Sequence, residues 1–248
     1  KWKRSWRDLP LKLNQWNNVV RWEFKHPVPF LRTREFLWNE GHTCFATKEE
    51  AEKECLQILN MYNSVLEDYF ALAAVKGKKT DNEKFAGAEY TLSLELFLPN
   101  GKAIQGPDAH YDGQNFAKAF EIKFLDKNEK EQFVYQNTWA ITTRMIGVLI
   151  MVHGDDKGLV LPPKLAPIQV VIVPILFKDS KEKVMEKANE MMQQLSNIAI
   201  VHLDDREEYN PGWKFNHYEL KGVPVRIEIG PKDVEKGQVV VVRRDTLV

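Results

Sequence analysis

Three arginines lie in apolar stretches of the chain, where a charged side chain needs an anionic partner: Arg21, Arg32 and Arg144. A guanidinium group binds phosphate or carboxylate oxygens through two parallel hydrogen bonds, and its planar shape is preorganised to do so. The three residues are therefore candidates for binding an anionic ligand. The alternative is a structural role, with Glu23 or Glu35 as ion-pair partners.

Two aromatic residues, Phe36 and Trp38, alternate along the segment that follows Arg32. This alternation would place both rings on the same face of a strand. An aromatic ring beside an arginine provides a flat surface on which a nucleobase can stack. The pair is also consistent with an ordinary hydrophobic core, and the sequence leaves both interpretations open.

The segments around these residues favour an antiparallel hairpin. β-Forming residues occupy positions 18–24, and an apolar and aromatic run occupies positions 31–38. Pro27 and Pro29 interrupt the stretch between them, because proline lacks the amide donor and has a fixed φ. The sequence therefore predicts two strands with an arginine near each end of the connecting loop.

A helix and further strands are predicted in the first two thirds of the chain. Thr47 precedes a run with apolar residues at spacings of three and four, which is typical of a capped amphipathic helix ending near residue 69. Residues 90–98 alternate between apolar and polar, as in a strand. Positions 102–105 and 115–136 supply more strand candidates, and positions 142–152 have helical spacing. Antiparallel strands with a few helices indicate an α+β domain.

The pattern changes after the prolines within residues 162–167. Residues 168–175 form a continuous apolar run of the kind found in buried parallel strands. Helical and strand-like segments then alternate, which predicts a small α/β domain: 181–195, 198–202, 212–221, 225–229 and 239–242. We place the boundary so that the first domain is residues 1–164 and the second is residues 165–248.

The composition excludes several classes of protein. The 248 residues carry 35 Lys and Arg against 35 Asp and Glu, which rules out a strongly basic arm or an acidic tail. A hydrophobic fraction of 44% rules out a disordered chain, and no apolar run approaches the ~18 residues that span a membrane. Cys44 and Cys55 cannot build a disulfide scaffold, and the histidines lack metal-binding spacing, so we expect a cytoplasmic protein without a resident metal. Because the first residue is Lys1, we expect a piece of a longer protein.

Longer motifs carry a specific resemblance to a known family. They share an unusual mixture of charged, aromatic and glycine residues and lie at 21–23, 32–42, 83–88, 113–118, 153–163, 211–215 and 219–224. The segment from Arg21 to His42 resembles motif 2 of the class II aminoacyl-tRNA synthetases, and the whole set most resembles the prolyl-tRNA synthetases of the eukaryotic and archaeal type. The resemblance implies a class II synthetase catalytic domain, an antiparallel sheet with helices, followed by a small α/β anticodon-binding domain.

The resemblance also implies an ATP site. Arg21 would bind the ATP α-phosphate together with the amino-acid carboxylate, and Arg144 of motif 3 would cover one face of the adenine. These two residues are the implied catalytic residues. Glu23 would meet the adenine amino group, Arg32 would reach the β- and γ-phosphates, and Phe36 would stack under the adenine.

Further positions complete the implied ligand site. Gln105 and Thr142 match positions that hold the nucleotide and its Mg²⁺. Trp38, His110 and Trp139 match positions that line the proline pocket, to which Arg21 would add its contact with the carboxylate.

The implied function is that of a ligase in protein biosynthesis. It would activate L-proline with ATP and Mg²⁺ to form prolyl-adenylate, and would then transfer proline to the 3′ end of tRNA(Pro) in the cytoplasm. The implied partners are proline, tRNA(Pro) and a second copy of the full-length protein, with no membrane. In the second domain Lys214, Lys221 and Arg226 could form a face that touches RNA, the alternative being solvated surface.

The chain departs from the family pattern at several positions. Motif 1, which builds the family's dimer interface, and a Thr-x-Glu loop that binds proline are expected before Lys1. Asp108 and Ala109 stand where the family has Thr and Ser, and Asp112 stands where it has Leu. These changes cluster around the implied pocket. The alternative function is therefore a catalytically impaired synthetase-like paralogue that acts as a tRNA- or protein-binding module.

Overall fold

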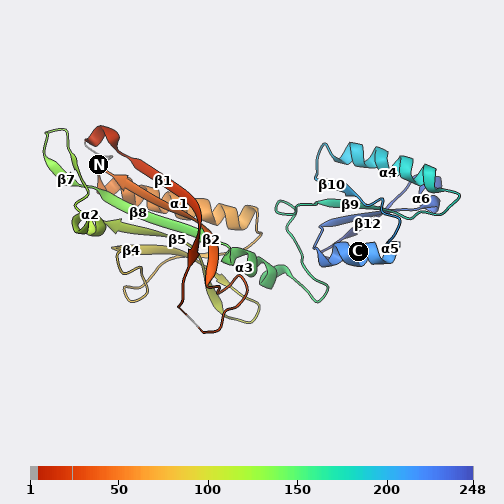
Figure 1. The fold of residues 1–248 in the computed structure, drawn as a ribbon, viewed down its shortest axis with the longest axis horizontal. Helices are drawn as coiled ribbons and strands as arrows, with labels where there is room; N and C mark the ends of the chain where they lie inside the picture. Colours follow the sequence, from red (N-terminus) through yellow and green to blue (C-terminus); the bar gives the residue numbers. More distant parts are fainter. Residues whose placement is uncertain (1–4, 24, 248) are drawn as a thin grey trace. The chain divides into compact units, whose positions relative to one another are not determined.

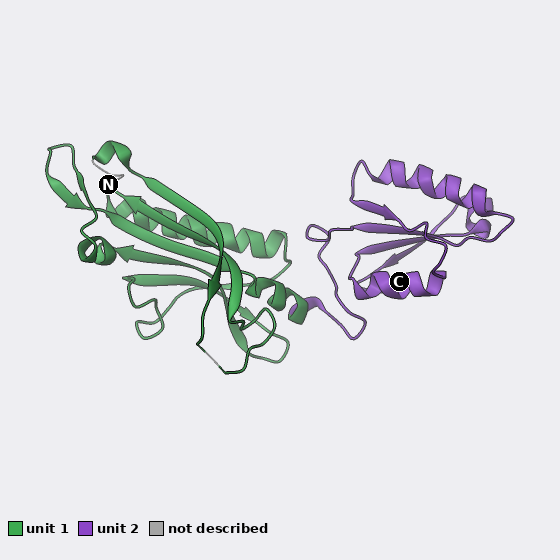
Figure 2. Ribbon diagram, viewed as in Figure 1, with its two compact units in different colours: residues 1–151 green, residues 152–248 purple. Residues whose placement is uncertain are grey.

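A computed structural model describes residues 5–23 and 25–247. The chain divides into two compact units, residues 1–151 and residues 152–248, which are coloured separately in Figure 2. Between α3 (Arg144–His153) and β9 (Val170–Pro174), a stretch described throughout, there is neither helix nor strand. The domain boundary at residues 164 and 165 falls in this stretch and stays a prediction.

The first unit is built on a six-stranded antiparallel sheet (Figure 1). In spatial order its strands are β1 (Leu11–Val20), β2 (Glu35–Phe45), β8 (Tyr135–Thr142), β5 (Ala103–Gly113), β4 (Tyr90–Phe97) and β3 (Val75–Lys78). β1 and β2 pair along their whole length, which makes them the predicted hairpin. The α+β class predicted for this part of the chain is confirmed.

One face of this sheet is covered by the long helix α1 (Lys48–Asp68). The helix begins where the sequence predicts, since Thr47 Oγ1 accepts a hydrogen bond from the Glu50 amide at 3.3 Å. The other elements of the unit are short: η1 (Trp6–Asp8), α2 (Asn115–Ala119), the two-stranded sheet of β6 (Lys123–Leu125) and β7 (Glu131–Phe133), and α3.

Alternation along the strands sends successive side chains to two different environments. On the face toward α1, Tyr62 Oη donates to Asn39 Oδ1 at 2.9 Å and Thr43 Oγ1 donates to Glu54 Oε2 at 2.5 Å. Asn137 Nδ2 also donates to Glu54 Oε2, at 3.1 Å. These buried polar groups are paired across the interface of sheet and helix, and the intervening residues point to the opposite face.

Three local predictions differ from the structure. The strand predicted at 18–24 is β1, which lies mostly before these residues, and Phe24 lies outside the described residues. The strand predicted at 31–38 is β2, which begins and ends later. The polar residues of β1 have low strand propensity, but the hydrogen bonds to β2 override that preference. Residues 115–119, predicted to be extended, form α2.

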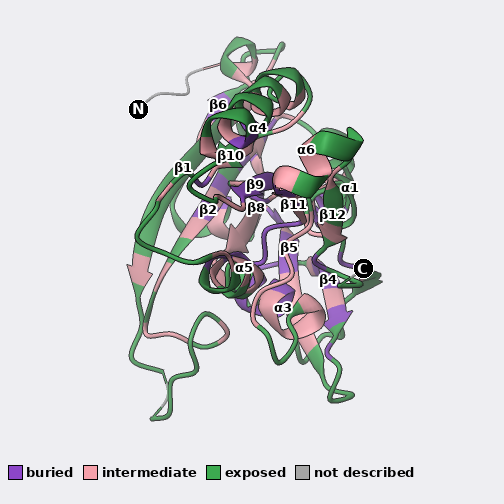
Figure 3. Cartoon of the chain, turned by 90° about the vertical axis from the view of Figure 1, so that its right-hand side faces the viewer, coloured by how far each residue is buried: buried purple, intermediate pink, exposed green. Residues whose placement is uncertain are grey.

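The second unit has three layers. Its sheet has the order β10 (Val201–Leu203), β9, β11 (Val225–Ile229) and β12 (Val240–Arg243), with β9 parallel to both neighbours. Alternate residues of β9 pack on α4 (Lys181–Leu195) on one face and on α5 (Pro211–Leu220) on the other, and α6 (Pro231–Lys236) packs beside α4. All five residues of β9 are buried (Figure 3), so the predicted buried parallel strand and α/β class are confirmed.

Candidate active site

A cavity of about 1020 Å³ lies on the face of the first sheet opposite α1. It is bordered by all the residues to which the sequence assigns a role: Arg21, Glu23, Arg32, Phe36, Trp38, Gln105, His110, Trp139, Thr142 and Arg144. They come from β2, β5, β8, α3 and the loop between β1 and β2. Segments far apart in the sequence therefore meet at one site.

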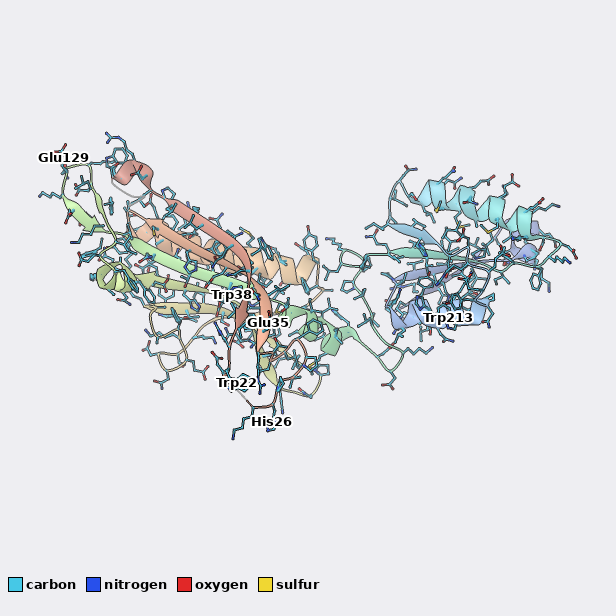
Figure 4. The ribbon with its side chains drawn as sticks, viewed as in Figure 1. Trp22, His26, Glu35, Trp38, Glu129 and Trp213 are labelled. Atoms are coloured by element: carbon cyan, nitrogen blue, oxygen red, sulfur yellow. The ribbon has the colours of Figure 1, made fainter. Side chains whose placement is uncertain are left out.

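The loop between β1 and β2 carries two of the arginines. Arg21 continues the hairpin ladder, because its amide donates to the carbonyl oxygen of Arg34 at 2.7 Å. Farther out, Val28 and Arg32 exchange two backbone hydrogen bonds of 2.9 Å, which fold the loop back on itself. Figure 4 follows the hairpin from the sheet to the tip of the loop through four labelled residues: Trp38, Glu35, Trp22 and His26.

Arg144, the first residue of α3, ties this loop to the sheet. Its Nε donates to the carbonyl oxygen of Leu31 at 3.0 Å, and its Nη1 donates to that of Gln105 at 3.3 Å. Gly147 permits the close approach, since a Cβ at that position would lie 2.9 Å from Leu31 Cδ2. Because Leu31 adjoins Arg32, these contacts also fix the point from which the Arg32 side chain extends.

The charges of Arg21 and Arg32 act on the guanidinium group of Arg144. Burial lowers the pKa of Arg144, and the positive charges of Arg32 and Arg21 lower it further, whereas Asp108 raises it. Arginine nevertheless stays protonated in proteins. Cations held near one another in a partly desolvated site favour an anion that carries several charges.

Phe36 and Trp38 form an aromatic floor beside Arg21. Their rings meet edge-to-face, with centroids 5.8 Å apart and planes at 87°. Arg21 Cζ lies 5.5 Å from the Phe36 centroid and 5.7 Å from that of Trp38. Trp38 Nε1 donates to Asn17 Oδ1 at 2.6 Å, which fixes the orientation of the indole. Both rings border the cavity, so they are not part of the core under α1.

The alternative of structural ion pairs holds only in part. Arg21 Nε lies 3.8 Å from Glu23 Oε1, and both side chains are exposed, so the pair contributes little to stability. Glu35 accepts a hydrogen bond from Asn18 Nδ2 at 2.7 Å. The weak pair leaves Arg21 available to a ligand.

His110 is held in one orientation on β5. Its Nδ1 lies 2.8 Å from Thr91 Oγ1, and its ring centroid lies 5.0 Å from that of Phe85. Burial, together with the positive charge of Lys79, lowers the pKa of His110 to about 4. The imidazole is therefore neutral at physiological pH and presents an uncharged flat surface to a ligand.

Asp108 lies two residues before His110 and borders the same cavity. Gln105 Nε2 donates to Asp108 Oδ2 at 2.6 Å, and His110 Nε2 lies 3.6 Å from Asp108 Oδ1. Burial raises the pKa of Asp108 to about 7, although the charges of Lys79 and Arg144 act to lower it. A carboxyl group that titrates near neutral pH thus lies close to both His110 and the arginines.

Two predicted features of the pocket lie on the other side of the sheet. Trp139 borders the cavity, but its indole covers Gly41 on the α1 face, where a Cβ added to Gly41 would lie 2.1 Å from the ring. The ring centroids of Trp139 and Tyr62 of α1 are 6.4 Å apart. Ala109, fully buried, pairs with Trp139 and alternates with His110. The indole therefore supports the sheet from behind, and the missing hydroxyl at position 109 would not have faced the cavity.

Sequence analysis gave no site role to several residues that also border the cavity: Lys79, Phe85, Thr91, Asp112 and Phe116. Thr91 carried a signal, because the alternation of residues 90–98 puts it on a polar face, and that face turns to the cavity. Asp112 carried one as well, since it follows Asp108 and His110 at a spacing of two. Lys79 lies in a lysine-rich stretch that is typical of solvent-exposed surface, so nothing distinguished it.

The described residues contain no group of three or more His, Cys, Asp and Glu side chains arranged to hold a metal ion. Within residues 5–23 and 25–247, the helices lack the combination of length and apolar character that crossing a membrane demands.

The second unit contains a buried ionic cluster at the end of β10. Asp204 accepts hydrogen bonds from Arg206 Nε at 2.9 Å, from Arg206 Nη2 at 2.7 Å and from Tyr218 Oη at 3.0 Å. Lys214 Nζ donates to the carbonyl oxygen of Asp204 at 2.9 Å. Burial would raise the pKa of Asp204, but these donors and the Lys214 charge hold it well below its usual range.

Of the three residues that could form a basic face in this unit, two are neither solvated surface nor free charges. Lys214 is buried, because it lies one helical turn before Tyr218 on the face of α5 that packs on the sheet. Arg226 pairs with Glu219 at 3.2 Å and with Glu228 at 2.9 Å, so its charge is balanced within the unit. An RNA-binding surface here cannot rest on these residues as free charges.

Comparison with known proteins agrees with this architecture. Residues 1–153 match the family described as the tRNA synthetase class II core domain (G, H, P, S and T). The chain belongs to the class II tRNA synthetase core family. Residues 169–248 match the anticodon binding domain, so the predicted pairing of a class II core with an anticodon-binding domain is confirmed.

Curated relatives of this class II chain include proline--tRNA ligases. The cytoplasmic proline--tRNA ligase of Arabidopsis thaliana is 56% identical over 248 residues, which cover 99% of this chain and 47% of that protein. The Natranaerobius thermophilus proline--tRNA ligase is 54% identical over 245 residues, which cover 99% of this chain and 50% of that protein. The Mus musculus bifunctional glutamate/proline--tRNA ligase is 56% identical over 255 residues, which cover 99% of this chain and 17% of that protein. The chain spans half the length of these relatives or less.

Proposed function

We propose that this chain holds the ATP site and part of the proline site of a prolyl-tRNA synthetase, together with its anticodon-binding domain. The complete protein would activate L-proline with ATP to form prolyl-adenylate and transfer the prolyl group to the 3′ end of tRNA(Pro), with AMP as the leaving group. The observation that carries this proposal is the convergence of Arg21, Arg32 and Arg144 on one cavity with Phe36 on its floor. A triphosphate bearing a nucleobase matches that combination of charges and aromatic surface.

The proposed reaction needs positioning and positive charge more than it needs a nucleophilic side chain. A carboxylate oxygen of proline attacks the α-phosphorus of ATP, the bond to the β-phosphate oxygen breaks, and pyrophosphate leaves. Arg21 lies at the aromatic floor, where the carboxylate and the α-phosphate would meet, and Arg32 and Arg144 would stabilise the remaining phosphate charge and the adenine. Fixed cations at the developing charge contribute through preorganisation.

The proline end of the site is assigned to the region around His110. The neutral imidazole, the Phe85 ring at 5.0 Å and the indole of Trp38 offer flat, uncharged surfaces that suit a small saturated ring. In this proposal Trp139 acts indirectly, because its ring packs behind the sheet over Gly41.

Mg²⁺ fits this site as a companion of ATP. It binds mostly through phosphate oxygens and water and needs at most one or two protein carboxylates. Asp108 and Gln105 supply oxygen donors on the cavity wall, with Thr142 nearby on β8. The ion would neutralise phosphate charge when bound. The proposal also includes a homodimer of the complete protein and a cytoplasmic location.

Amino-acid-dependent exchange of pyrophosphate into ATP tests the proposal. The complete protein should catalyse exchange with L-proline and, at the same concentration, at least about tenfold more slowly with alanine or valine, which fill the pocket less well. An Arg21→Lys variant is the matched control, since it keeps the charge and loses the two-point contact. Exchange that is absent with proline, or equally fast with the other amino acids, would contradict the assignment.

A second candidate function follows from Asp108. An ionised carboxylate about 4 Å from a phosphate repels it by about 4 kcal/mol at an effective dielectric near 20, and Asp108 is close enough to Arg144 to affect its pKa. If this repulsion dominates, the protein is an impaired paralogue that binds tRNA or protein. Asp108→Thr would then raise proline-dependent exchange at least about tenfold. A fall would show that Asp108 serves activation as it stands.

A further inference from the structure

Asp112 is a buried carboxyl group that the interactions of the fold do not account for. It lies near the end of β5, two residues after His110, and borders the cavity. The residue is 1% exposed, and neither of its carboxyl oxygens has a hydrogen-bond partner among the described residues. A buried polar group without a partner costs free energy, so a ligand that supplies the missing hydrogen bond would bind favourably.

A bulge in β5 determines the position of this carboxyl group. The register of β5 against β8 passes from Tyr111 opposite Asn137 to Gly113 opposite Gln136, which leaves Asp112 as the extra residue of a bulge. Bulges redirect a side chain next to a functional site. Gln136 also borders the cavity, and its Oε1 is likewise buried without a partner. Two acceptors on neighbouring strands thus share this end of the cavity.

The surroundings of Asp112 differ from those of Asp108. Burial raises the pKa of Asp112 to about 7, and the Thr138 hydroxyl acts to lower it as a nearby donor, although no hydrogen bond of normal geometry joins the two side chains. Lysine and arginine charges, which act on Asp108, do not contribute to the pKa of Asp112. A carboxyl group in such an uncharged setting suits a neutral hydrogen-bonding partner better than an ion.

An aromatic wall connects Asp112 with the place assigned to the amino acid. Phe85 lies 5.0 Å from His110 and stacks on Phe116 of α2 at 5.9 Å, measured between ring centroids. Phe116 borders the same cavity as Asp112. A small ring bound against His110 therefore has apolar walls beside it, in the cavity that the two unpaired acceptors also border.

We propose that Asp112 and Gln136 form a subsite that accepts a hydrogen bond from a hydroxyl group on the ring of the amino acid bound against His110. The ligand class is a hydroxylated imino acid, for example a 4-hydroxyproline. Proline presents only C–H groups there and leaves both acceptors unpaired. A ring hydroxyl that pairs with one of these buried acceptors adds affinity to that of proline, which the same pocket also holds. This inference rests on the proposed function, because it assumes that an imino acid occupies the cavity.

The test uses the complete protein and three adenylate analogues that cannot be hydrolysed: 5′-O-(L-prolylsulfamoyl)adenosine and the two C4 epimers of its 4-hydroxyprolyl counterpart. Dissociation constants are measured by calorimetry for the wild-type protein, Asp112→Leu and Asp112→Asn. In the wild type, one hydroxyprolyl epimer should bind at least as tightly as the prolyl analogue. Asp112→Leu should change the ratio of the prolyl and hydroxyprolyl dissociation constants by about tenfold or more, in favour of the prolyl analogue. Asp112→Asn, which keeps the shape of the side chain, should shift it in the same direction by less.

The outcomes separate the two proposals. Failure of the wild type to bind any of the analogues would overturn the proposed function, and the subsite with it. Tight binding of the prolyl analogue with a ratio that is the same in the wild type and in both variants would overturn the subsite alone, and would leave a buried water as the partner of Asp112. Asp112→Asn keeps the test decisive if the leucine variant does not fold.

Discussion

Asp108→Asn should remove a large part of the pH dependence of the stability of the first unit. Burial raises the pKa of Asp108 from 3.8 to about 7 in the folded chain. The folded carboxyl group therefore holds its proton to a higher pH than the unfolded one. This contribution to stability is fully present below about pH 4 and is lost as the pH rises through 7.

The size of the effect follows from the difference between the two pKa values. About three pH units at about 1.4 kcal/mol per unit give a loss of at most about 4 kcal/mol between pH 4 and pH 8. The asparagine variant cannot ionise, and its side-chain oxygen can still accept the hydrogen bond from Gln105. Its free energy of unfolding at pH 8 should exceed that of the wild type by up to this amount, whereas the two proteins should be similar at about pH 4 and should diverge steadily between pH 4 and pH 7.

Urea unfolding at a series of pH values between 4 and 8.5, followed by far-UV circular dichroism, measures this difference. Asp81→Asn is the matched control, because Asp81 is an exposed aspartate of the same unit and should give a curve parallel to that of the wild type. A curve for Asp108→Asn that also runs parallel to the wild type would refute the reasoning. It would mean that Lys79 and Arg144 already compensate the buried charge.

Three further predictions concern the cavity and its support. Arg21→Ala should lower kcat/KM for proline activation by about 10²–10³, because it removes a charged donor that acts on the transition state, and pyrophosphate exchange measures this loss. Phe36→Ala should weaken ATP binding by about 1–3 kcal/mol in calorimetry, since it removes the stacking surface for the base. Gly41→Ala should cost about 1–3 kcal/mol in urea unfolding, because its Cβ would lie 2.1 Å from the Trp139 ring. Gly77→Ala is the control for this last change, as a Cβ there meets nothing within 4 Å, and equal losses in the two variants would count against the packing argument.

Elements with strong periodicity could be predicted from the sequence. The helix predicted at 181–195 is α4 with these bounds, and the strand predicted at 225–229 is β11. Both carry their packing pattern within a few residues of chain. β1 could not be located this way, because its polar residues are extended only through their pairing with β2. The sequence shows local periodicity, and it does not show which distant segment completes a sheet.

The site illustrates the same limit at the level of single residues. The resemblance to a family brought together the right stretches of chain, but it did not show the direction of each side chain. Trp139 borders the cavity, but its ring lies on the α1 face. The register of β8 with β2 and β5 decides which face of the sheet each side chain takes. Lys214 could have been recognised as buried from its spacing to Tyr218, since residues four apart share a helical face. The bond of Arg144 to Leu31 joins residues 113 positions apart, and no local pattern predicts it.

The two faces of the first sheet explain why a ligand site forms on one of them. On the α1 face, Asn39 and Thr43 find partners in Tyr62 and Glu54, although Asn137 Oδ1 and Trp139 Nε1 are buried there without one. On the cavity face, arginines lie close enough to lower the pKa of Arg144, and burial keeps two carboxyl groups protonated up to about pH 7. The same strands carry both faces, so backbone strain does not account for the difference. A ligand that presents negative charge to the arginines and a donor to the buried acceptors would stabilise the folded chain, by an amount that rises with the logarithm of its concentration above the dissociation constant.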